Sequence, residues 1–281
     1  MEIFRTSKEM QAWSKKEHAA GRKIAFVPTM GALHDGHLSL LKHGKNQADK
    51  LVLSIYVNPA QFGQSEDLST YPRDIDGDLA KAKGLGTDAV FLPDNSIMYP
   101  PTYQTYINVQ NLSKNLCGIS RPKHFQGVAT VVLKLFNIVQ PDVAIFGEKD
   151  FQQLAIIRQM TKDLNLQIKI IGMPIVREED GLAMSSRNRY LSKEQRQIAF
   201  SIPKALSNAK KAIFNNPIQV KDLQNLIKET LHSSIKIDYI KICDPTTLED
   251  LTKLQLPALI ALAVYIENTR LIDNCIIRPL A

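Results

Sequence analysis

Short apolar runs alternate with amphipathic stretches through the first two thirds of the chain. The apolar runs are rich in β-branched and aromatic residues, as buried strands are, and lie at Lys23–Val27, Lys50–Val57, Ala89–Leu92, Asp142–Phe146 and Ile168–Ile171. Helices are predicted at Thr6–Gly21, Gly36–Gln47, Asp74–Gly84, Val128–Val139 and Phe151–Leu164. We expect Pro28 to end the first strand, because proline has no N–H to donate. This alternation predicts an α/β fold whose mainly parallel sheet is doubly wound, with helices on both faces.

The pattern changes after residue 175. Two helices and three strands are expected there, at Ser192–Asn215, Pro217–Ser233, Ile237–Ile242, Leu259–Ile266 and Leu271–Ile277. A hairpin turn is expected at Glu267–Thr269, and the long irregular stretch Pro93–Lys123 is expected to be a functional loop or lid. The pattern therefore predicts a Rossmann-like domain over residues 1–175 and a smaller C-terminal α+β domain over residues 176–281, joined by a polar hinge at Arg177–Gly181.

Composition narrows the class of protein. The chain has 281 residues, 44% of them hydrophobic and 22% charged, which is typical of a globular protein with a substantial core. The N-terminus lacks a continuous apolar segment and the best apolar stretch, Leu256–Ile266, is too short to span a bilayer, so we expect no membrane association and a cytoplasmic protein. Cys117, Cys243 and Cys275 form no C-x-x-C pair and are expected to be reduced thiols.

The net charge of +7 favours anionic partners without deciding which. Lysines are spread along the chain in small clusters such as Lys15–Lys16 and Lys210–Lys211, and no long basic run occurs. Such clusters are typical of solvated helix faces, so nucleic-acid binding is disfavoured. Positive charge gathered in a nucleotide-binding cleft would explain the same net charge.

The stretch Val27–Leu41, VPTMGALHDGHLSLL, passes from the first strand into a helix. Gly31 and Gly36 let a ligand approach the backbone, and the first N–H groups of a helix are unpaired and attract anions. His34 and His37 are three residues apart, so both can face one side and donate to phosphate oxygens. Their position between strand and helix predicts a nucleotide-phosphate site.

Two alternatives stay open for this stretch. Two histidines and two glycines near a turn can cap a helix without binding any ligand. Zinc ligation is the weaker alternative, because the Glu of H-E-x-x-H is missing, a spacing of three suits a helix-face site less well than four, and no cysteine lies nearby.

A second strand-to-helix turn follows at Gly147–Asp150. It repeats the geometry of the first, so two helix starts are expected to converge on one crevice at the strand ends. Lys149 would reach a phosphate, Asp150 could hold a ribose hydroxyl, and Gln153 can face the same pocket.

Five motifs together resemble those of one family. PTMGALHDGHLSL, YVNPAQFG, YPRD, FGEKDFQQ and MSSRN are similar, in order and approximate interval, to the motifs of the pantothenate synthetase (pantoate–β-alanine ligase) family. HDGH is similar to the HIGH signature of class I aminoacyl-tRNA synthetases and nucleotidyltransferases. MSSRN, at Met184–Asn188, resembles their KMSKS loop, and its two hydroxyls and one guanidinium suit a mobile phosphate clamp.

The resemblance implies a role for each motif residue. His37, His34, Lys149 and Arg187 would stabilise charge as catalytic residues. Pantoate and β-alanine would be bound by Gln61, Gln153, Pro28, Asn58, Tyr71 and Arg121, with Phe62 on the apolar side. ATP would be bound by Met30, Gly31, Ala32, Leu33, His34, Asp35, Gly36, His37, Gly147, Glu148, Lys149, Asp150, Val176, Met184, Ser185, Ser186 and Arg187. Asp78 would lie near Mg²⁺ and the triphosphate, although Gly77 stands where some members have a second acid.

The implied reaction is the ATP-dependent condensation of (R)-pantoate with β-alanine, giving pantothenate, AMP and diphosphate through a pantoyl-adenylate, with Mg²⁺ as cofactor and a homodimer as the assembly. Two other classes remain open. One is a HIGH-type nucleotidyltransferase that acts on another small substrate. The other is a non-catalytic RNA-binding relative of the synthetases, which the absence of a clustered basic and aromatic surface in the sequence disfavours.

Overall fold

The computed structural model describes residues 1–63, 66–215 and 217–279. Its larger sheet has six strands, all paired in parallel, in the order β1-β4-β3-β2-β5-β6. The strands are β1 (Glu2–Phe4), β2 (Ile24–Thr29), β3 (Lys50–Ile55), β4 (Ala89–Phe91), β5 (Val143–Gly147) and β6 (Lys169–Met173). The order reverses at β2, which β3 flanks on one side and β5 on the other. The carboxyl ends of β2 and β5 therefore border a switch point, where open α/β sheets bind ligands.

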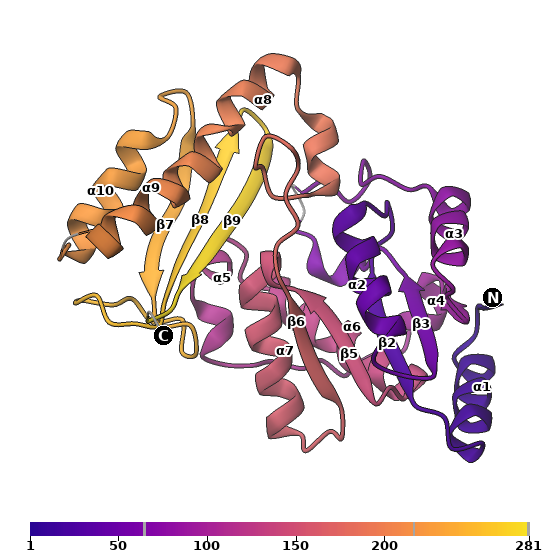
Figure 1. Cartoon of the computed structure of the whole chain (residues 1–281). Coiled ribbons are helices and arrows are strands. Elements are labelled where there is room, and N and C mark those ends of the chain that lie inside the picture. The colour runs from indigo at the N-terminus through magenta and orange to yellow at the C-terminus, as the bar shows by residue number, and fades with distance from the viewer. Residues whose placement is uncertain (64–65, 216, 280–281) are drawn as a thin grey trace.

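Helices cover both faces of this sheet (Figure 1). On one face α2 and α3 pack over Val27 and Leu53, while on the other α1, α6 and α7 pack over Phe26 and Val52. Successive residues of β2 and β3 thus enter opposite layers, which explains their continuous apolar sequences and confirms the doubly wound fold. The helices are α1 (Ser7–Ala19), α2 (Asp35–Lys45), α3 (Ile75–Gly84), α4 (Asn95–Met98), α5 (Cys117–Ser120), α6 (His124–Val139) and α7 (Phe151–Asp163), and the 3₁₀ turns are η1 (Pro59–Gln61), η2 (Leu112–Lys114) and η3 (Glu148–Asp150).

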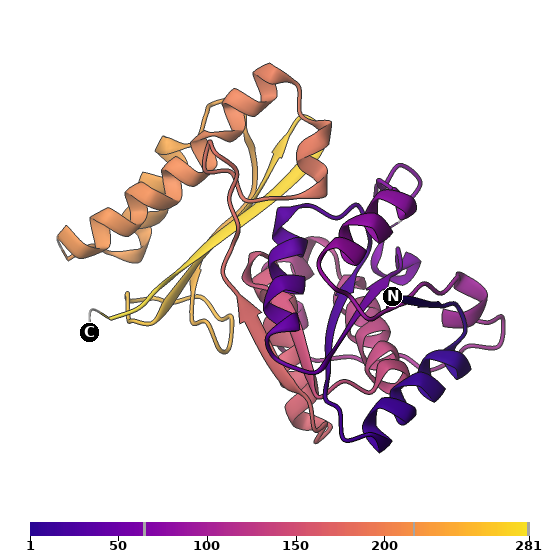
Figure 2. The same cartoon turned by 45° about the vertical axis from the view of Figure 1, so that its right-hand side comes forward.

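The last third of the chain forms a separate three-stranded antiparallel sheet in the order β7-β8-β9. Figure 2 shows α9 and α10 on the side of this sheet that faces away from the parallel sheet. The elements are η4 (Ser186–Tyr190), α8 (Lys193–Ala199), α9 (Ser201–Asn215), α10 (Val220–Thr230), β7 (Lys236–Cys243), β8 (Ala258–Ile266) and β9 (Thr269–Ile277).

Strand β8 is apolar along almost its whole length because both of its faces are covered. Leu259 and Ala261 belong to the apolar cluster that contains α6 and α7, whereas Ile260 and Leu262 pack with α9 and α10. The small sheet is therefore anchored to the large one by apolar contact, and its β9 edge lies near the carboxyl ends of the parallel strands.

Three of the differences from the sequence prediction have a clear structural reason. Strand β2 continues through Pro28 to Thr29, where it pairs with β3 alone. Its pairing with β5 ends at Phe26, so no neighbouring strand needs the N–H that proline lacks. The helix predicted at Ser192–Asn215 is divided at Phe200, since Pro203 cannot donate to the backbone of the preceding turn. Strand β1 was not predicted, because three residues are too few to show a period.

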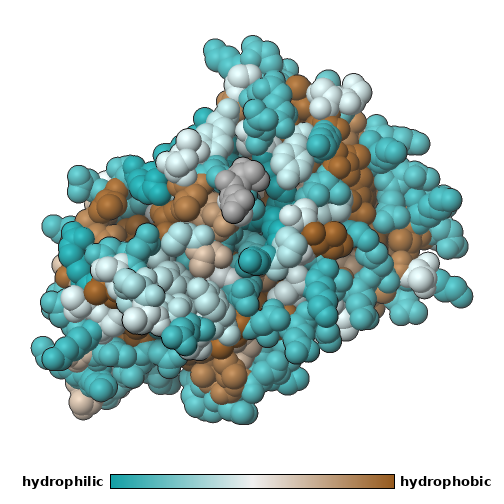
Figure 3. All heavy atoms as spheres, turned by 180° about the vertical axis from the view of Figure 1, so that it is seen from behind, coloured by the Kyte–Doolittle hydropathy of each residue, from teal (hydrophilic) through white to brown (hydrophobic). Residues whose placement is uncertain are grey.

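Hydrophilic side chains dominate the reverse face of the molecule, where hydrophobic side chains gather only in separate patches (Figure 3). Within the described ranges, none of the helices combines the length and apolar character needed to cross a membrane.

Candidate active site

A cavity of about 1200 Å³ opens at the carboxyl ends of β2 and β5. Its walls come from both parts of the chain: His34 and Lys149 follow the two central strands, while Arg187 and Arg270 belong to the C-terminal part. The volume exceeds that of a typical pocket for one small molecule. The cavity can therefore hold a nucleotide together with a second substrate.

His34 and His37 lie side by side at the start of α2, with ring centres 4.1 Å apart. Burial, helped by the charge of Lys149, lowers the pKa of His34 to about 4. Burial, helped by His34, lowers the pKa of His37 to about 3, so both rings are neutral at pH 7. Nδ1 of His37 accepts the N–H of His34 at 3.4 Å, which leaves its proton on Nε2. Nδ1 of His34 is buried without a hydrogen-bond partner among the described residues.

Gly36 is required by the packing of this pair. A Cβ at Gly36 would lie 2.8 Å from Cε1 and 2.9 Å from Nδ1 of His34. Any larger residue would displace the His34 ring, so the glycine of HDGH serves the histidine before it.

Asp78 of α3 fixes the turn that precedes His34. Its Oδ2 and Oδ1 accept the N–H groups of Ala32 at 2.7 Å and Leu33 at 2.6 Å. The carboxylate therefore satisfies both N–H groups, and neither is free to bind a phosphate in this structure. Burial raises the pKa of Asp78 against the effect of these bonds.

The position of Asp78 does not support its predicted contact with Mg²⁺. The side chain is buried under the turn and is not part of the cavity wall. In the part of the chain that the structure describes, no cluster of three or more His, Cys, Asp or Glu residues could hold a metal ion. We therefore do not assign Asp78 as a metal ligand.

Lys149 follows β5 on the second turn. Its Nζ lies 3.8 Å from Oδ2 of Asp150, and its charge lowers the pKa of both His34 and His37, so the ammonium is close to the histidine pair. Asn274 of β9 holds this turn through its Nδ2, which donates to the carbonyl oxygens of Glu148 at 3.0 Å and Lys149 at 2.9 Å. The C-terminal sheet thus positions the lysine turn directly.

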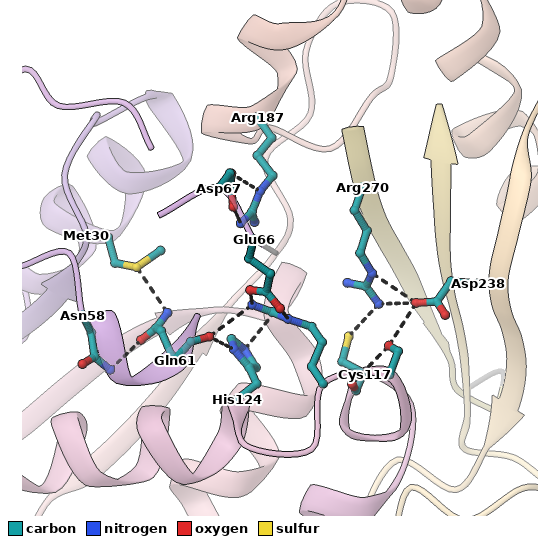
Figure 4. Close-up of polar contacts among 12 residues, drawn as sticks. Met30, Asn58, Gln61, Glu66, Asp67, Cys117, His124, Arg187, Asp238 and Arg270 are labelled. Carbon is teal, nitrogen blue, oxygen red and sulfur yellow. Dashed lines mark hydrogen bonds and ion pairs between the residues drawn. The ribbon is translucent and has the colours of Figure 1, made fainter. Parts of the chain in front are cut away.

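The segment Met184–Asn188 reaches the first turn from the C-terminal part. The hydroxyl of Ser186 donates to the carbonyl of Ala32 at 3.4 Å. Arg187 donates from Nε and Nη2 to the Asp67 carboxylate at 2.9 and 2.7 Å (Figure 4). Burial alone would raise the pKa of Asp67, but this pairing holds it below its usual value. The guanidinium that the sequence assigned to phosphate therefore already binds an anion of the protein.

Gln61 ends η1 at the opposite side of the cavity. Nδ2 of Asn58 donates to its Oε1 at 3.0 Å, and its Nε2 lies 3.2 Å from the sulfur of Met30. Arg121 pairs with Glu66 and donates to the backbone carbonyl of Gln61 at 3.2 Å. Its guanidinium is thus engaged by protein groups.

The structure brings most of the predicted site residues to this one cavity. Those in its wall are Pro28, Met30, His34, Gly36, His37, Asn58, Gln61, Phe62, Tyr71, Arg121, Gly147, Lys149, Asp150, Gln153, Val176, Met184, Ser185, Ser186 and Arg187. Predicted residues outside the wall are Gly31, Ala32, Leu33, Asp35, Asp78 and Glu148. Ala32 and Leu33 are buried beneath the turn, whereas Asp35 is exposed on its outer side.

A polar group that the sequence analysis missed borders the cavity at α5, β7 and β9 (Figure 4). Nη2 of Arg270 donates to Oδ2 of Asp238 at 2.7 Å and lies 3.4 Å from Sγ of Cys117. That sulfur is 3.3 Å from the hydroxyl of Tyr239, and Cys117 is a free thiol, as predicted. These residues come from segments far apart in the chain, so no local motif could mark them.

A parallel α/β sheet that carries two helix starts, a neutral histidine pair and a lysine at its switch point defines a nucleotide-binding enzyme of the doubly wound class. The family described as pantoate-beta-alanine ligase matches residues 2–276. The chain belongs to this family, and it is a ligase that forms a carbon–nitrogen bond.

Similar proteins cover nearly the whole chain. A pantothenate synthetase of Desulfatibacillum aliphaticivorans is 53% identical over 99% of this chain and 100% of its own length, and one of Syntrophus aciditrophicus is 51% identical over 98% and 96%. The pantothenate synthetase structure from Thermus thermophilus has a TM-score of 0.94 at 40% identity, covering 99% of this chain and 100% of that one. A pantoate-beta-alanine ligase from Francisella tularensis, complexed with beta-gamma ATP and beta-alanine, has a TM-score of 0.83 at 37% identity, covering 98% and 97%.

Proposed function

We propose that this chain joins (R)-pantoate to β-alanine with ATP, and that it does so through a pantoyl-adenylate, releasing diphosphate and then AMP. The observation that carries the proposal is that the neutral pair His34 and His37, together with Lys149, faces the same cavity as Gln61 and Gln153. Family membership and the Francisella relative complexed with beta-gamma ATP and beta-alanine support the same substrates.

The first step activates the pantoate carboxylate, which is a poor acyl donor. One carboxylate oxygen forms a bond to the α-phosphorus of ATP, the bond from that phosphorus to the bridging oxygen breaks, and diphosphate leaves with the electron pair. Negative charge grows on the phosphate oxygens as this happens. His37 donates from Nε2, and the ammonium of Lys149 adds positive charge beside it. Donors fixed before reaction stabilise the transition state more than the ground state.

The leaving diphosphate is the ligand that we assign to Ser185, Ser186 and Arg187. A guanidinium can bind two phosphate oxygens at once, as Arg187 binds both oxygens of Asp67 in this structure. The triphosphate would therefore compete with Asp67 for the same donors. This exchange couples ATP binding to the release of Arg187 from Asp67.

Pantoate is assigned to the side of the cavity lined by Gln61 and Gln153. The apolar body of the substrate would lie against Pro28, Met30 and Phe62, which line the same wall. In the second step the neutral amine of β-alanine attacks the carbonyl carbon of the adenylate and the bond from that carbon to the AMP oxygen breaks. The nitrogen releases one proton to water, and the amide forms. No serine or cysteine nucleophile is required, because the two substrates supply both reacting groups.

Several parts of the sequence prediction remain predictions. These are the domain boundary at residues 175 and 176, the hinge at Arg177–Gly181, the homodimer and the cytoplasmic location. Mg²⁺ would enter with the nucleotide phosphates, and we assign no protein ligand to it and no step of the mechanism.

The experiment that tests this function measures AMP and diphosphate release with each substrate omitted in turn. We expect AMP only when pantoate, β-alanine and ATP are all present, and pantoate-dependent exchange of labelled diphosphate into ATP without β-alanine. Release of ADP, or retention of the nucleotide on the product, would instead indicate a different ATP-dependent reaction.

A further inference from the structure

The backbone carbonyl of Gln61 is held by two donors from the start of α6. Nδ1 of His124 lies 2.8 Å from this oxygen, and Nη2 of Arg121 donates to it at 3.2 Å (Figure 4). A carbonyl oxygen can only accept, so Nδ1 of His124 must carry the proton. Burial lowers the pKa of His124 to about 4, so the ring is neutral and its Nε2 is an acceptor. Nη1 of Arg121 lies 3.3 Å from that Nε2 and donates to it.

Arg121 is in turn fixed by the carboxylate of Glu66. Nε of Arg121 donates to Oε1 of Glu66 at 2.7 Å, and Nη2 pairs with Oε2. Burial alone would raise the pKa of Glu66, but the bonds and charge of Arg121 hold it below its usual value. A charged pair of this kind fixes both side chains better than a neutral bond does.

Close packing of α6 against η1 places these donors under Gln61. A Cβ at Gly127 would lie 2.2 Å from the carbonyl oxygen of Ala60, so only glycine permits this approach. Nδ2 of Asn58 donates to the carbonyl of Gly127 at 3.1 Å and to Oε1 of Gln61 at 3.0 Å.

The contact from Asn58 decides which atom Gln61 offers to a ligand. Its Oε1 is already an acceptor for Asn58, whereas its Nε2 has only the weak sulfur acceptor of Met30 at 3.2 Å. Gln61 therefore faces the cavity as a donor, and the ligand atom that it binds must be an acceptor, such as a carboxylate or hydroxyl oxygen.

We propose that His124 and Arg121 are positioning residues that act on pantoate only through Gln61, by fixing its backbone so that Nε2 points at a substrate oxygen. This inference rests on the proposed function and changes the role of Arg121, which the sequence assigned to direct substrate binding. Four of the five N–H donors of Arg121 are used by Gln61, His124 and Glu66.

The test compares two replacements of His124. His124→Leu removes the donor, and we expect the KM for pantoate to rise roughly three- to tenfold, as for one lost hydrogen bond, with the KM for ATP unchanged. His124→Asn keeps an N–H near the position of Nδ1 and should restore most of the pantoate affinity. His43→Leu, a histidine near the end of α2 outside the cavity wall, is the matched control. Thermal melts establish that each variant is folded.

A double-mutant cycle separates positioning from direct contact. In a Gln61→Ala background, His124→Leu should cause no further rise in the KM for pantoate, because its effect passes through Gln61. An additional rise equal to that in the wild type, a failure of His124→Asn to restore affinity, or a pantoate KM indifferent to Gln61→Ala would each overturn the proposal. If His124→Leu does not fold, Arg121→Met removes a donor to the same carbonyl and is subjected to the same cycle. The proposed function fails separately, if the wild-type chain makes no pantothenate.

Discussion

The two sides of the expected phosphate site are built in different ways. The β2–α2 turn holds His34 and His37 neutral, fixed by Asp78 beneath the backbone, with a buried nitrogen of His34 still unpaired among the described residues. The segment Met184–Asn188 instead carries a cation, Arg187, whose donors are already bound to Asp67. The first side needs only a ligand, whereas the second must exchange one anion for another.

This difference in construction indicates what the β2–α2 turn and the segment Met184–Asn188 each contribute to the reaction. A preorganised neutral donor costs little to keep in place and acts without rearrangement when charge develops. An arginine paired with a carboxylate is stable while the site is empty and becomes available only when the carboxylate is displaced. We therefore expect the turn to govern the chemical step and the segment to govern the binding and departure of the phosphates.

The largest effect should come from His37→Ala. Loss of one fixed donor to developing charge should lower the rate of adenylate formation about a hundredfold or more, since such a donor contributes roughly 3 kcal/mol. Diphosphate exchange into ATP, with pantoate and without β-alanine, measures this step. The fold should persist, as a thermal melt would show. A nearly normal exchange rate would remove His37 from the catalytic group.

Arg187→Ala should slow adenylation by roughly one to three orders of magnitude, as for other groups that neutralise transferring phosphates. Attack of β-alanine on preformed pantoyl-adenylate involves no β- or γ-phosphate, so that half-reaction should keep its rate. Single-turnover measurements separate the two steps. Equal losses of rate in both half-reactions would show that Arg187 acts in closure or structure. The assignment of the chemical step to the β2–α2 turn and of the phosphates to Met184–Asn188 would then be wrong.

Asp67→Asn should have a smaller and opposite effect. Removing the carboxylate charge frees Arg187 for the triphosphate, so the KM for ATP should fall roughly three- to tenfold, given that a partly exposed ion pair contributes about 1 kcal/mol. Asp76→Asn, an exposed acid on α3, is the matched control. An unchanged or higher KM for ATP would mean that Asp67 positions Arg187 for phosphate rather than competing for it.

A further prediction concerns the dependence of stability on pH. The folded pKa values of His34 and His37, about 4 and about 3, lie below that of an unfolded histidine, so the unfolded chain binds more protons as the pH falls below about 6.5. The free energy of unfolding should therefore decline from about pH 6.5 toward pH 4, by at most about 1.4 kcal/mol per pH unit for each histidine.

The ion pair of Asp67 with Arg187 should break only at lower pH, because the pKa of Asp67 lies below its usual value. Its contribution to the free energy of unfolding is lost as the carboxylate protonates. Urea unfolding at successive pH values measures both effects. His34→Asn removes one titrating ring and should make the decline shallower. A free energy of unfolding that is level from pH 7 to pH 4.5 would contradict the neutral, buried state of the histidine pair.

The sequence was sufficient for the fold because its strands are buried on both faces and its helices are amphipathic, and both produce clear periods. It also located the two turns of the site, because HDGH and GEKD each occupy a short stretch between a strand and a helix. The prediction that Pro28 ends the first strand was wrong because the sequence does not show which strands flank it. Only the sheet order shows that β5 no longer pairs with β2 at this position.

The contacts that hold the site were not predictable in the same way. Asn274 reaches the Lys149 turn across 125 residues, and Asp67 reaches Arg187 across 120. A single asparagine or aspartate in a polar stretch carries no local pattern, so its partner is known only when the two parts of the chain are folded together. Asp78 was identified by its place in a motif, but its role was not predicted. It was assigned to a metal, whereas its carboxylate supports the backbone of the turn.

The most direct test of the mechanism follows the oxygen atoms of pantoate. Pantoate labelled with ¹⁸O in both carboxylate positions is converted with ATP and β-alanine, and the products are analysed by mass spectrometry. Attack of the carboxylate on the α-phosphorus predicts one ¹⁸O atom in AMP, one in the amide carbonyl of pantothenate and none in diphosphate. Label in diphosphate or in free phosphate, or AMP without label, would contradict a pantoyl-adenylate intermediate.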